Sequence, residues 1–402
     1  MLIEGKTLPS LFLKKGEGRR FKNNHPWVFS NELKEIPKIE SGSFVSLYDF
    51  KGEFLAIGYF NPHTLIAFRK LSSEKFLEKE FIYQRILKAK EVRDSIYGKN
   101  EAKRVVFGEC DNLPGLIVDY YGDVITIQIL TAGMERLKEE IVDSIKRIFN
   151  PESIILRNDP SVRDLEGLKK EKMVVYGENS TIRTKFSGID FEFDGLKCQK
   201  TGLFLDQREN IRLLDHFDFK GKRVLDLFSY FGSSGLYSLQ KGAKETIFVD
   251  SSEYAIEIAK ESAKRNNLKN GVFIKGDVFD VLKDLSKERF DFIFSDPPSF
   301  AKSSKMINEA IKGYTNLNSM CFKLLKEKGI LIASSCSYHI SLEIFFESLR
   351  QSAIRSKRDA KLLFYGIQSF DHPALLNFPE SLYLKTIFLM GSLISRSLSR
   401  AK

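Results

Sequence analysis

The sequence has few cysteines and no long apolar run. It contains four cysteines in 402 residues and no Cys-x-x-Cys pair. This argues against a zinc site or a disulfide framework and favours a reducing compartment. The apolar run at 386–394 is far shorter than the roughly 20 residues that a membrane helix needs. Because Glu4 and Lys6 interrupt the apolar N-terminus, no signal peptide is expected. We therefore expect a cytoplasmic protein with no metal and no membrane partner.

Length and charge indicate several domains and a polyanionic partner. A chain of 402 residues is long for a single hydrophobic core, so two or three domains are expected. The formal net charge of +10 favours nucleic acid as the partner. A generally lysine-rich composition is the alternative that the charge alone leaves open.

The second half of the chain alternates between two kinds of pattern. Apolar runs that end in a small or acidic residue alternate with segments of helical spacing, which predicts a parallel α/β sheet with its site at the strand carboxyl ends. The expected strands are 224–228, 246–250, 272–275, 290–295 and 329–334. The expected helices are 211–217, 234–241, 253–266, 278–285, 308–326 and 341–355.

The first half has a different pattern. Residues 1–75 contain short β-prone runs separated by turn residues, and residues 76–187 mix strand and helix patterns. These differences divide the chain into a β-rich domain at 1–75, an α+β domain at 76–187 and an α/β domain at 188–390. A basic tail at 391–402 is expected to be disordered.

The turn after the first α/β strand indicates the cofactor. It reads Phe-Ser-Tyr-Phe-Gly-Ser-Ser-Gly at 228–235 and lacks the dinucleotide fingerprint Gly-x-Gly-x-x-Gly. S-adenosylmethionine carries no phosphate and needs a carboxylate for its ribose hydroxyls, which Asp250 after the second strand can supply. Asp277 can accept from the adenine amine and Val278 can offer an amide. The ordered series predicts a class I methyltransferase domain, and its members are Asp226, Gly232, Asp250, Asp277 and Asp296.

A conspicuous block stands before that strand. It reads Lys-Thr-Gly-Leu-Phe-Leu-Asp-Gln-Arg at 200–208. The guanidinium of Arg208 is suited to the carboxylate of the cofactor's methionine part. The ordinary start of an amphipathic helix is the alternative.

Two further motifs carry the candidate chemistry. Asp-Pro-Pro-Ser-Phe at 296–300 follows the fourth strand, and its prolines fix an extended turn that can aim Asp296 and Phe300 at a flat base. This loop alone does not choose between amino and carbon methylation. Cys336 follows a strand that reads Gly-Ile-Leu-Ile-Ala-Ser-Ser. A thiolate there can add to C6 of cytosine and activate C5, which is nucleophilic catalysis. A small buried side chain is the alternative role for any lone cysteine.

Together these motifs resemble the large-subunit ribosomal RNA cytosine-C5 methyltransferases that carry an N-terminal PUA domain. The resemblance covers about residues 10–390. The motifs that carry it lie at 25–30 (His-Pro-Trp-Val-Phe-Ser), 113–119, 162–168, 201–208, 228–232, 296–300, 335–337 (Ser-Cys-Ser) and 371–373 (Asp-His-Pro).

The resemblance implies a PUA domain, a central α+β domain and a C-terminal Rossmann-like methyltransferase domain whose last strand is antiparallel. It also implies that Cys336 is the nucleophile, that Asp296 assists at the cytosine edge and that Pro297 and Phe300 face the RNA base. The cofactor residues implied at and after the first strand are Asp226, Phe228, Ser229, Tyr230, Gly232, Asp250, Asp277, Val278 and Asp296. The turn departs from the family pattern at Ser233-Ser234, which affects only the fine cofactor contacts.

The expected partner is large-subunit ribosomal RNA. A basic cluster near Trp27 suits contact with the RNA backbone, and it consists of Arg19, Arg20, Lys22 and His25. A solvated charged surface over a packed Trp27 is the alternative. Guanine or adenine N-methylation and a non-catalytic assembly role are the competing functions, and a homodimer is left open.

Overall fold

A computed structural model describes residues 8–301 and 303–393. The described chain forms two compact units. Unit 1 comprises residues 8–184, 193–205 and 370–381, and unit 2 comprises 185–192, 206–369 and 382–393. Strands β11 (Thr181–Phe186) and β12 (Ile189–Asp194) form a separate two-stranded sheet. Among the described residues, no helix has the length and apolarity required to cross a bilayer.

Unit 1 begins with a small β-sheet of order β1-β3-β4-β5-β2. Alternating side chains such as Val45 and Leu47 point into its core, so period-two spacing explains these strands. A short helix, α1 (Arg19–Lys22), precedes β2. The strands are β1 (Ser10–Phe12), β2 (Trp27–Phe29), β3 (Ser43–Tyr48), β4 (Phe54–Phe60) and β5 (Ile66–Ser72).

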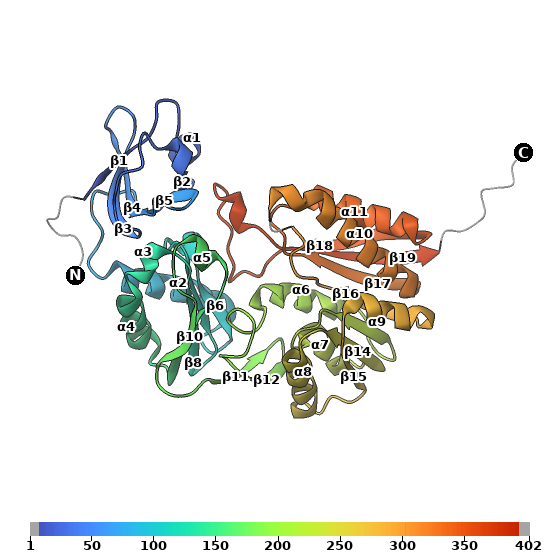
Figure 1. The fold of residues 1–402 in the computed structure, drawn as a ribbon. Coiled ribbons are helices and arrows are strands. Elements are labelled where there is room, and N and C mark those ends of the chain that lie inside the picture. Colours follow the sequence, from blue (N-terminus) through green and yellow to red (C-terminus); the bar gives the residue numbers. More distant parts are fainter. Residues whose placement is uncertain (1–7, 302, 394–402) are drawn as a thin grey trace, which may run out of the picture. The chain divides into compact units, whose positions relative to one another are not determined.

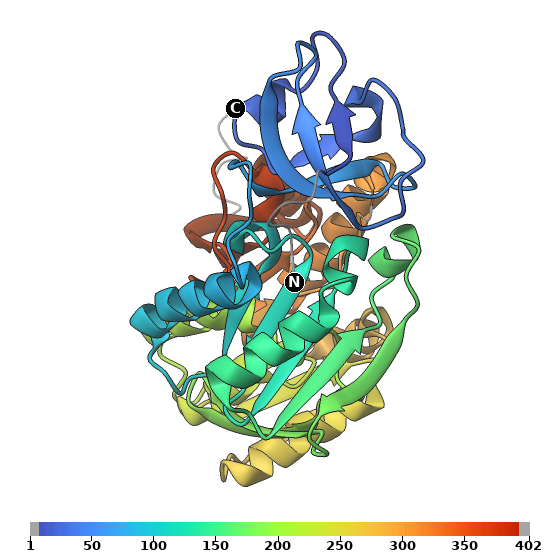
Figure 2. The same ribbon diagram turned by 90° about the vertical axis from the view of Figure 1, so that its left-hand side faces the viewer.

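A second sheet of unit 1 has the order β10-β9-β8-β7-β6. Gly122 supplies the left-handed backbone (φ 80°) for the turn between β7 and β8. Helix α4 (Lys138–Phe149) lies along one face of the sheet and buries Ile141 and Ile145 (Figure 2). The other helices are α2 (Phe81–Tyr97), α3 (Ala132–Glu135) and α5 (Val162–Leu165). The strands are β6 (Lys103–Phe107), β7 (Leu116–Tyr120), β8 (Val124–Ile129), β9 (Ser153–Asn158) and β10 (Glu171–Tyr176).

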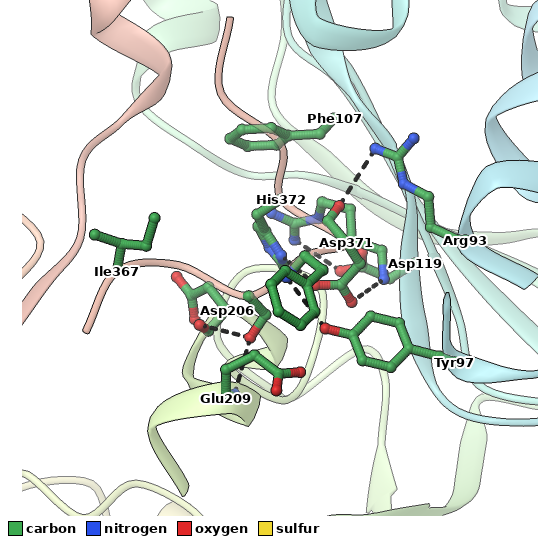
Figure 3. A network of polar contacts seen from close by, with 12 residues as sticks. Arg93, Tyr97, Phe107, Asp119, Asp206, Glu209, Ile367, Asp371 and His372 are labelled. Atoms are coloured by element: carbon green, nitrogen blue, oxygen red, sulfur yellow. Dashed lines mark hydrogen bonds and ion pairs between the residues drawn. The ribbon is translucent and has the colours of Figure 1, made fainter. Parts of the chain in front are cut away.

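Residues 370–381 belong to unit 1 although they lie between two strands of unit 2 in the sequence. Arg93 donates to the main-chain oxygen of Asp371 at 3.3 Å, and the Tyr97 hydroxyl accepts from the Phe370 amide at 3.1 Å (Figure 3). The ring of Phe378 packs edge-on against Trp27 with 4.6 Å between the centroids. The Asp-His-Pro motif therefore has a packing role within unit 1.

Unit 2 is built on a seven-stranded sheet of order β15-β14-β13-β16-β17-β19-β18 (Figure 1). The strands from β13 to β17 are parallel, and β19 runs antiparallel to both of its neighbours. This confirms the predicted α/β fold and its antiparallel last strand. The strands are β13 (Arg223–Leu227), β14 (Glu245–Asp250), β15 (Gly271–Lys275), β16 (Phe290–Ser295), β17 (Leu325–Ser335), β18 (Arg358–Gly366) and β19 (Lys385–Leu393).

Helices connect the parallel strands of unit 2. Helices α7 and α8 pack against β13–β15, whereas α10 and α11 pack against each other and against β16–β18. The helices are α6 (Arg208–Arg212), α7 (Ser233–Gln240), α8 (Glu253–Arg265), α9 (Val278–Asp284), α10 (Ile307–Leu324) and α11 (Leu342–Arg355). Because consecutive parallel strands end at one edge, the loops after β13, β14, β16 and β17 meet there.

Some elements differ from the sequence expectations. The helix expected at 211–217 begins earlier as α6 and ends in a 3-10 turn at Leu213–His216. The apolar run at 386–394 forms most of β19, so residues 391–393 of the expected tail are in a strand. Residues 394–402 lie outside the described part of the chain.

Candidate active site

The loop after β13 has an unusual backbone. Phe228 and Tyr230 are non-glycine residues with φ of 56° and 50°, a region that costs about 1–3 kcal/mol per residue. Two hydrogen bonds hold this shape: the Ser229 amide donates to the Val249 oxygen at 3.0 Å, and the Tyr230 amide donates to Asp250 Oδ2 at 2.9 Å. Strain that the surrounding structure maintains is typical of a ligand-binding loop.

The glycines of this loop allow a close approach between β13, β14 and α7. A Cβ on Gly235 would lie 2.3 Å from the Phe248 ring and 2.7 Å from Asp226 Oδ2. Gly232 ends the loop with φ of 76°. The Gly235 amide donates to Asp226 Oδ2 at 2.9 Å. The short turn thus brings the buried carboxylate of Asp226 against the start of α7.

Three carboxylates influence one another at this edge of the sheet. Burial raises the pKa of Asp226 well above its usual range, and the nearby charges of Asp296 and Asp250 raise it further. Asp250 accepts backbone hydrogen bonds through both oxygens, from Tyr230 and from Ser252 (2.8 Å). A ligand with positive charge would relieve this concentration of negative charge.

A buried hydroxyl also fits a polar ligand. Ser229 Oγ is buried in the loop and has no hydrogen-bond partner among the described residues. Because S-adenosylmethionine carries an ammonium, a sulfonium and polar oxygens, its chemistry suits Ser229 and the three carboxylates. The residues present therefore fit the expected cofactor.

The remaining expected cofactor residues differ in their exposure to solvent. Asp277 is exposed and caps α9, where its Oδ1 accepts from the amides of Phe279 (2.9 Å) and Asp280 (3.3 Å). Val278 is the buried first residue of α9. The Arg208 guanidinium is buried and lies 5.0 Å from the centroid of the Phe186 ring.

The Asp296–Phe300 loop follows β16. Gln207 Nε2 donates to Asp296 Oδ2 at 2.9 Å, and Gln207 Oε1 accepts from Asn210 Nδ2 at 2.7 Å. Gln207 therefore orients the Asp296 carboxylate. Pro297 is buried, and the half-buried Phe300 ring packs against Tyr314 with 4.8 Å between the centroids. One side of the Phe300 ring is thus held by the protein.

Cys336 follows β17 directly and is half-buried. Since β16 and β17 are parallel neighbours, with Ser295 opposite Ala333, Cys336 and Asp296 emerge at the same edge of the sheet. The negative charges of both residues act on the Tyr314 hydroxyl, whose pKa is raised mainly by burial. The structure therefore brings together the two residues expected to be catalytic.

Hydroxyl groups join the loops that carry Asp296 and Cys336. Ser337 Oγ lies 2.9 Å from Ser299 Oγ and 3.1 Å from Tyr314 Oη. Ser335 Oγ donates to Tyr314 Oη at 2.9 Å. This network fixes the spacing of the two loops.

Lys385, the first residue of β19, is a further residue of this site. Its Cα pairs with that of Ser335, and its Nζ donates to the main-chain oxygen of Ser337 at 2.7 Å. Burial lowers the pKa of Lys385 to about 8, and a Cys336 thiolate opposes this shift. No motif in the sequence marks Lys385, because its position depends on antiparallel pairing between distant segments. Gln207, in contrast, lies inside the conspicuous 200–208 block.

The other three cysteines lie in different environments. Cys321 is fully buried in the core of unit 2, and burial raises the pKa of its thiol to about 12. Cys198 is buried, accepts from Arg157 Nη1 at 2.7 Å and has a pKa raised to about 11 by burial. Burial also raises the pKa of Cys110 to about 11. Cys336 alone lies at the carboxyl end of a parallel strand of unit 2.

The four expected RNA-contact residues lie in or just after α1 of unit 1, and they differ in exposure and in ion pairing. Arg19 is exposed and has no ion pair among the described residues. Arg20 pairs with Glu380, and Lys22 pairs with Asp49 at 3.1 Å. His25 is only 2% exposed and lies against Glu380, with 3.2 Å between Nε2 and Oε2.

Trp27 is held by the protein. Its indole Nε1 donates to Glu109 at 2.7 Å, and the Arg69 guanidinium lies 5.2 Å from its ring centroid. These contacts correspond to the packed Trp27 of the alternative interpretation.

Comparisons with known proteins identify two domains and close relatives. Residues 11–73 match a PUA-like domain, and residues 218–371 match a methyltransferase domain. Ribosomal RNA large subunit methyltransferase I from Tolumonas auensis is 34% identical over 388 residues, covering 94% of this chain and 98% of the relative. The Aeromonas salmonicida protein of the same name is 35% identical over 389 residues, covering 93% and 97%.

Solved structures agree on the fold. A protein from Streptococcus mutans described as an S-adenosylmethionine-dependent methyltransferase has a TM-score of 0.81 at 21% identity, covering 95% of this chain and all of the other. A methyltransferase solved with S-adenosylhomocysteine has a TM-score of 0.82 at 21% identity, with the same coverage. These likenesses establish the shared architecture.

Proposed function

Because this chain belongs to the ribosomal RNA large subunit methyltransferase I family, we propose that it methylates C5 of a cytosine in large-subunit ribosomal RNA, with Cys336 as the nucleophile. The broader activity follows from the family: the chain is an S-adenosylmethionine-dependent ribosomal RNA methyltransferase. The observation that carries the finer proposal is the half-buried Cys336 beside the Asp296 loop.

The residues of the site divide the chemistry between them. When bound, S-adenosylmethionine supplies an electrophilic methyl group. Asp226, Ser229 and Asp250 hold it, and the Asp296 carboxylate accepts a hydrogen bond from the exocyclic amine of the base. Pro297 and Phe300 line the place of the base, and Gln207 keeps Asp296 in position.

The covalent route explains why a cysteine is required. The Cys336 thiolate adds to C6, and the C5=C6 electron pair moves to C5, which is otherwise a poor nucleophile. C5 is then the atom that would accept the methyl group supplied by bound S-adenosylmethionine, which would leave as S-adenosylhomocysteine. A base removes the C5 proton, the electron pair of the C5–H bond restores the double bond, and the thiolate leaves.

Replacing Cys336 with alanine tests this route. Methyl transfer to ribosomal RNA should fall by several orders of magnitude, because C5 has no other means of activation. Cofactor and RNA affinity should persist, since the small thiol contributes little to either. The measurement is transfer of labelled methyl groups to a large-subunit transcript, with mapping of the modified nucleotide.

Cys321→Ala is the matched control, because it removes a thiol from the core of the same unit. It should cost some stability and leave the rate nearly unchanged. Comparable turnover by Cys336→Ala would refute the covalent route and favour N-methylation of guanine or adenine at the Asp296–Phe300 loop. If wild-type protein binds RNA but never transfers a methyl group, the non-catalytic assembly role would replace both.

The RNA and assembly partners follow from the same proposal. We expect exposed basic residues of the PUA-like region, Arg19 above all, to contact the phosphate backbone. His25 can reach RNA only if its buried contacts open.

Sedimentation at increasing protein concentration distinguishes a monomer from a homodimer. A cytoplasmic location is expected because the substrate is ribosomal RNA.

A further inference from the structure

Lys385 is a buried lysine of β19. It is 9% exposed, and no ion pair joins it to a carboxylate among the described residues. Its Nζ donates to the Ser337 oxygen at 2.7 Å. Burying an ammonium without a carboxylate carries a large desolvation cost, so such a group is a candidate for a functional role.

The sheet places this ammonium beside Cys336. Strand β19 runs antiparallel to β17, and Lys385 lies opposite Ser335, the residue before Cys336. The carbonyl that Lys385 contacts belongs to the residue after Cys336. The chain around the thiol is therefore held on both sides by one lysine. Burial lowers the pKa of Lys385 to about 8, and the thiolate of Cys336 favours its charged form.

The ionisable groups described around this pair are of several kinds. Asp296 adds negative charge from the loop after β16, and burial keeps the Tyr314 hydroxyl of α10 in its neutral form. His339 lies three positions after Cys336 with its ring 5.4 Å from that of Tyr338. On the β19 side, Tyr383 donates to Asp206 at 2.5 Å. Within the described part of the chain, Lys385 is thus an amine in position to balance a thiolate.

We propose that Lys385 is a positioning residue that keeps Cys336 in the thiolate form and holds the Ser337 carbonyl, so that the sulfur is ready to attack. This inference rests on the proposed role of Cys336 as nucleophile. An opposite charge within a few ångströms stabilises the charged form of its neighbour, and the thiolate is the reactive form of cysteine. The neighbouring Asp296 charge would otherwise favour the neutral thiol.

The test compares the reactivity of Cys336 in three variants of the full chain. Lys385→Gln can retain a hydrogen bond to the Ser337 oxygen but has no charge, Lys385→Met lacks both, and Lys385→Arg keeps the charge. Lys361→Met, an exposed lysine of β18, is the control. Alkylation of Cys336 by iodoacetamide is followed by mass spectrometry of its peptide from pH 5 to pH 10, and thermal unfolding verifies each fold.

If the positive charge of Lys385 stabilises the thiolate, the variants should differ in the pH dependence of alkylation. In Lys385→Gln and Lys385→Met the alkylation midpoint should move up by about one pH unit or more, with about tenfold slower alkylation at pH 7 and similar rates near pH 10. Methyl transfer should fall in parallel. Lys385→Arg should restore a large part of both properties, and Lys361→Met should match the wild type.

An unchanged alkylation profile in Lys385→Gln would overturn the inference, as would full methyl transfer by that variant. If Lys385→Met fails to fold, the Gln and Arg variants decide the question. Failure of the proposed function is read separately, from activity that survives Cys336→Ala. The alkylation profile needs neither RNA nor cofactor, so the two failures cannot be confused.

Discussion

Replacing Asp226 with asparagine should make the cofactor-free protein more stable and the cofactor complex weaker. Asp226 is 4% exposed, and the one hydrogen bond that its carboxylate accepts among the described residues comes from the Gly235 amide at 2.9 Å. An asparagine oxygen can accept the same bond. The change therefore removes mainly the cost of a buried carboxylate beside Asp250 and Asp296, which is about 1–3 kcal/mol for such a group.

The pH dependence of this gain has a definite sign. The pKa of Asp226 in the folded protein is raised above its ordinary value of 3.8. A group of this kind stabilises the fold only below its unfolded pKa, and the stability is lost as the pH rises through the folded pKa. The variant has no such loss. The difference in stability should therefore be near zero at about pH 4 and grow toward neutral pH.

Thermal unfolding of both proteins without cofactor, at a series of pH values, measures this difference. For a unit of this size, each kcal/mol gained in the free energy of unfolding should raise Tm by about 2–4 °C. Calorimetry should show S-adenosylmethionine affinity reduced by about tenfold or more, because a charged partner of the ligand is lost. A variant that is less stable at pH 8, or one with unchanged cofactor affinity, would refute this account of Asp226.

Two further changes test the support of the site and the RNA surface. Gln207→Leu removes the hydrogen-bond donor to Asp296, which should raise the activation free energy of methyl transfer by about 1.5–3 kcal/mol and so lower the rate constant. Saturation kinetics measure this effect, and an unchanged rate constant would remove Gln207 from the site. Arg19→Glu should weaken RNA binding and reduce the slope of log affinity against log salt concentration by about one. Titrations at several salt concentrations measure both effects. Lys22→Glu is the comparison, since Lys22 is paired with Asp49 and should contribute less; an equal effect of both changes would contradict the assignment.

Much of unit 2 could be predicted because its information is local. Each parallel strand is a short apolar run, and its functional residue lies at its end, as Asp250 ends β14 and Cys336 follows β17. The carboxyl ends of parallel strands share one edge of a sheet, so the sequence predicts that these residues lie at the same edge. The glycine turn and the Asp-Pro-Pro loop add local backbone constraints of the same kind.

The missed features depend on contacts between distant parts of the chain. Lys385 approaches Cys336 only because β19 returns antiparallel to β17, a pairing that no local pattern specifies. The burial of His25 depends on Phe378 and Glu380, which come from the opposite end of the sequence. A basic residue near an aromatic residue looks the same in sequence whether it faces solvent or a packed segment. The sequence therefore could not divide the basic cluster near Trp27 into exposed and packed members.

A covalent complex with substrate analogue RNA tests the central claim most directly. In RNA that carries 5-fluorocytosine at the target position, the thiolate can add and the methyl group can be transferred, but the fluorine cannot leave as a proton does. The account predicts a stable protein–RNA adduct that requires S-adenosylmethionine, forms with Cys321→Ala and is absent with Cys336→Ala. Its mass should localise to the peptide that contains Cys336. Methylation of the natural RNA without any adduct on the analogue would contradict the account.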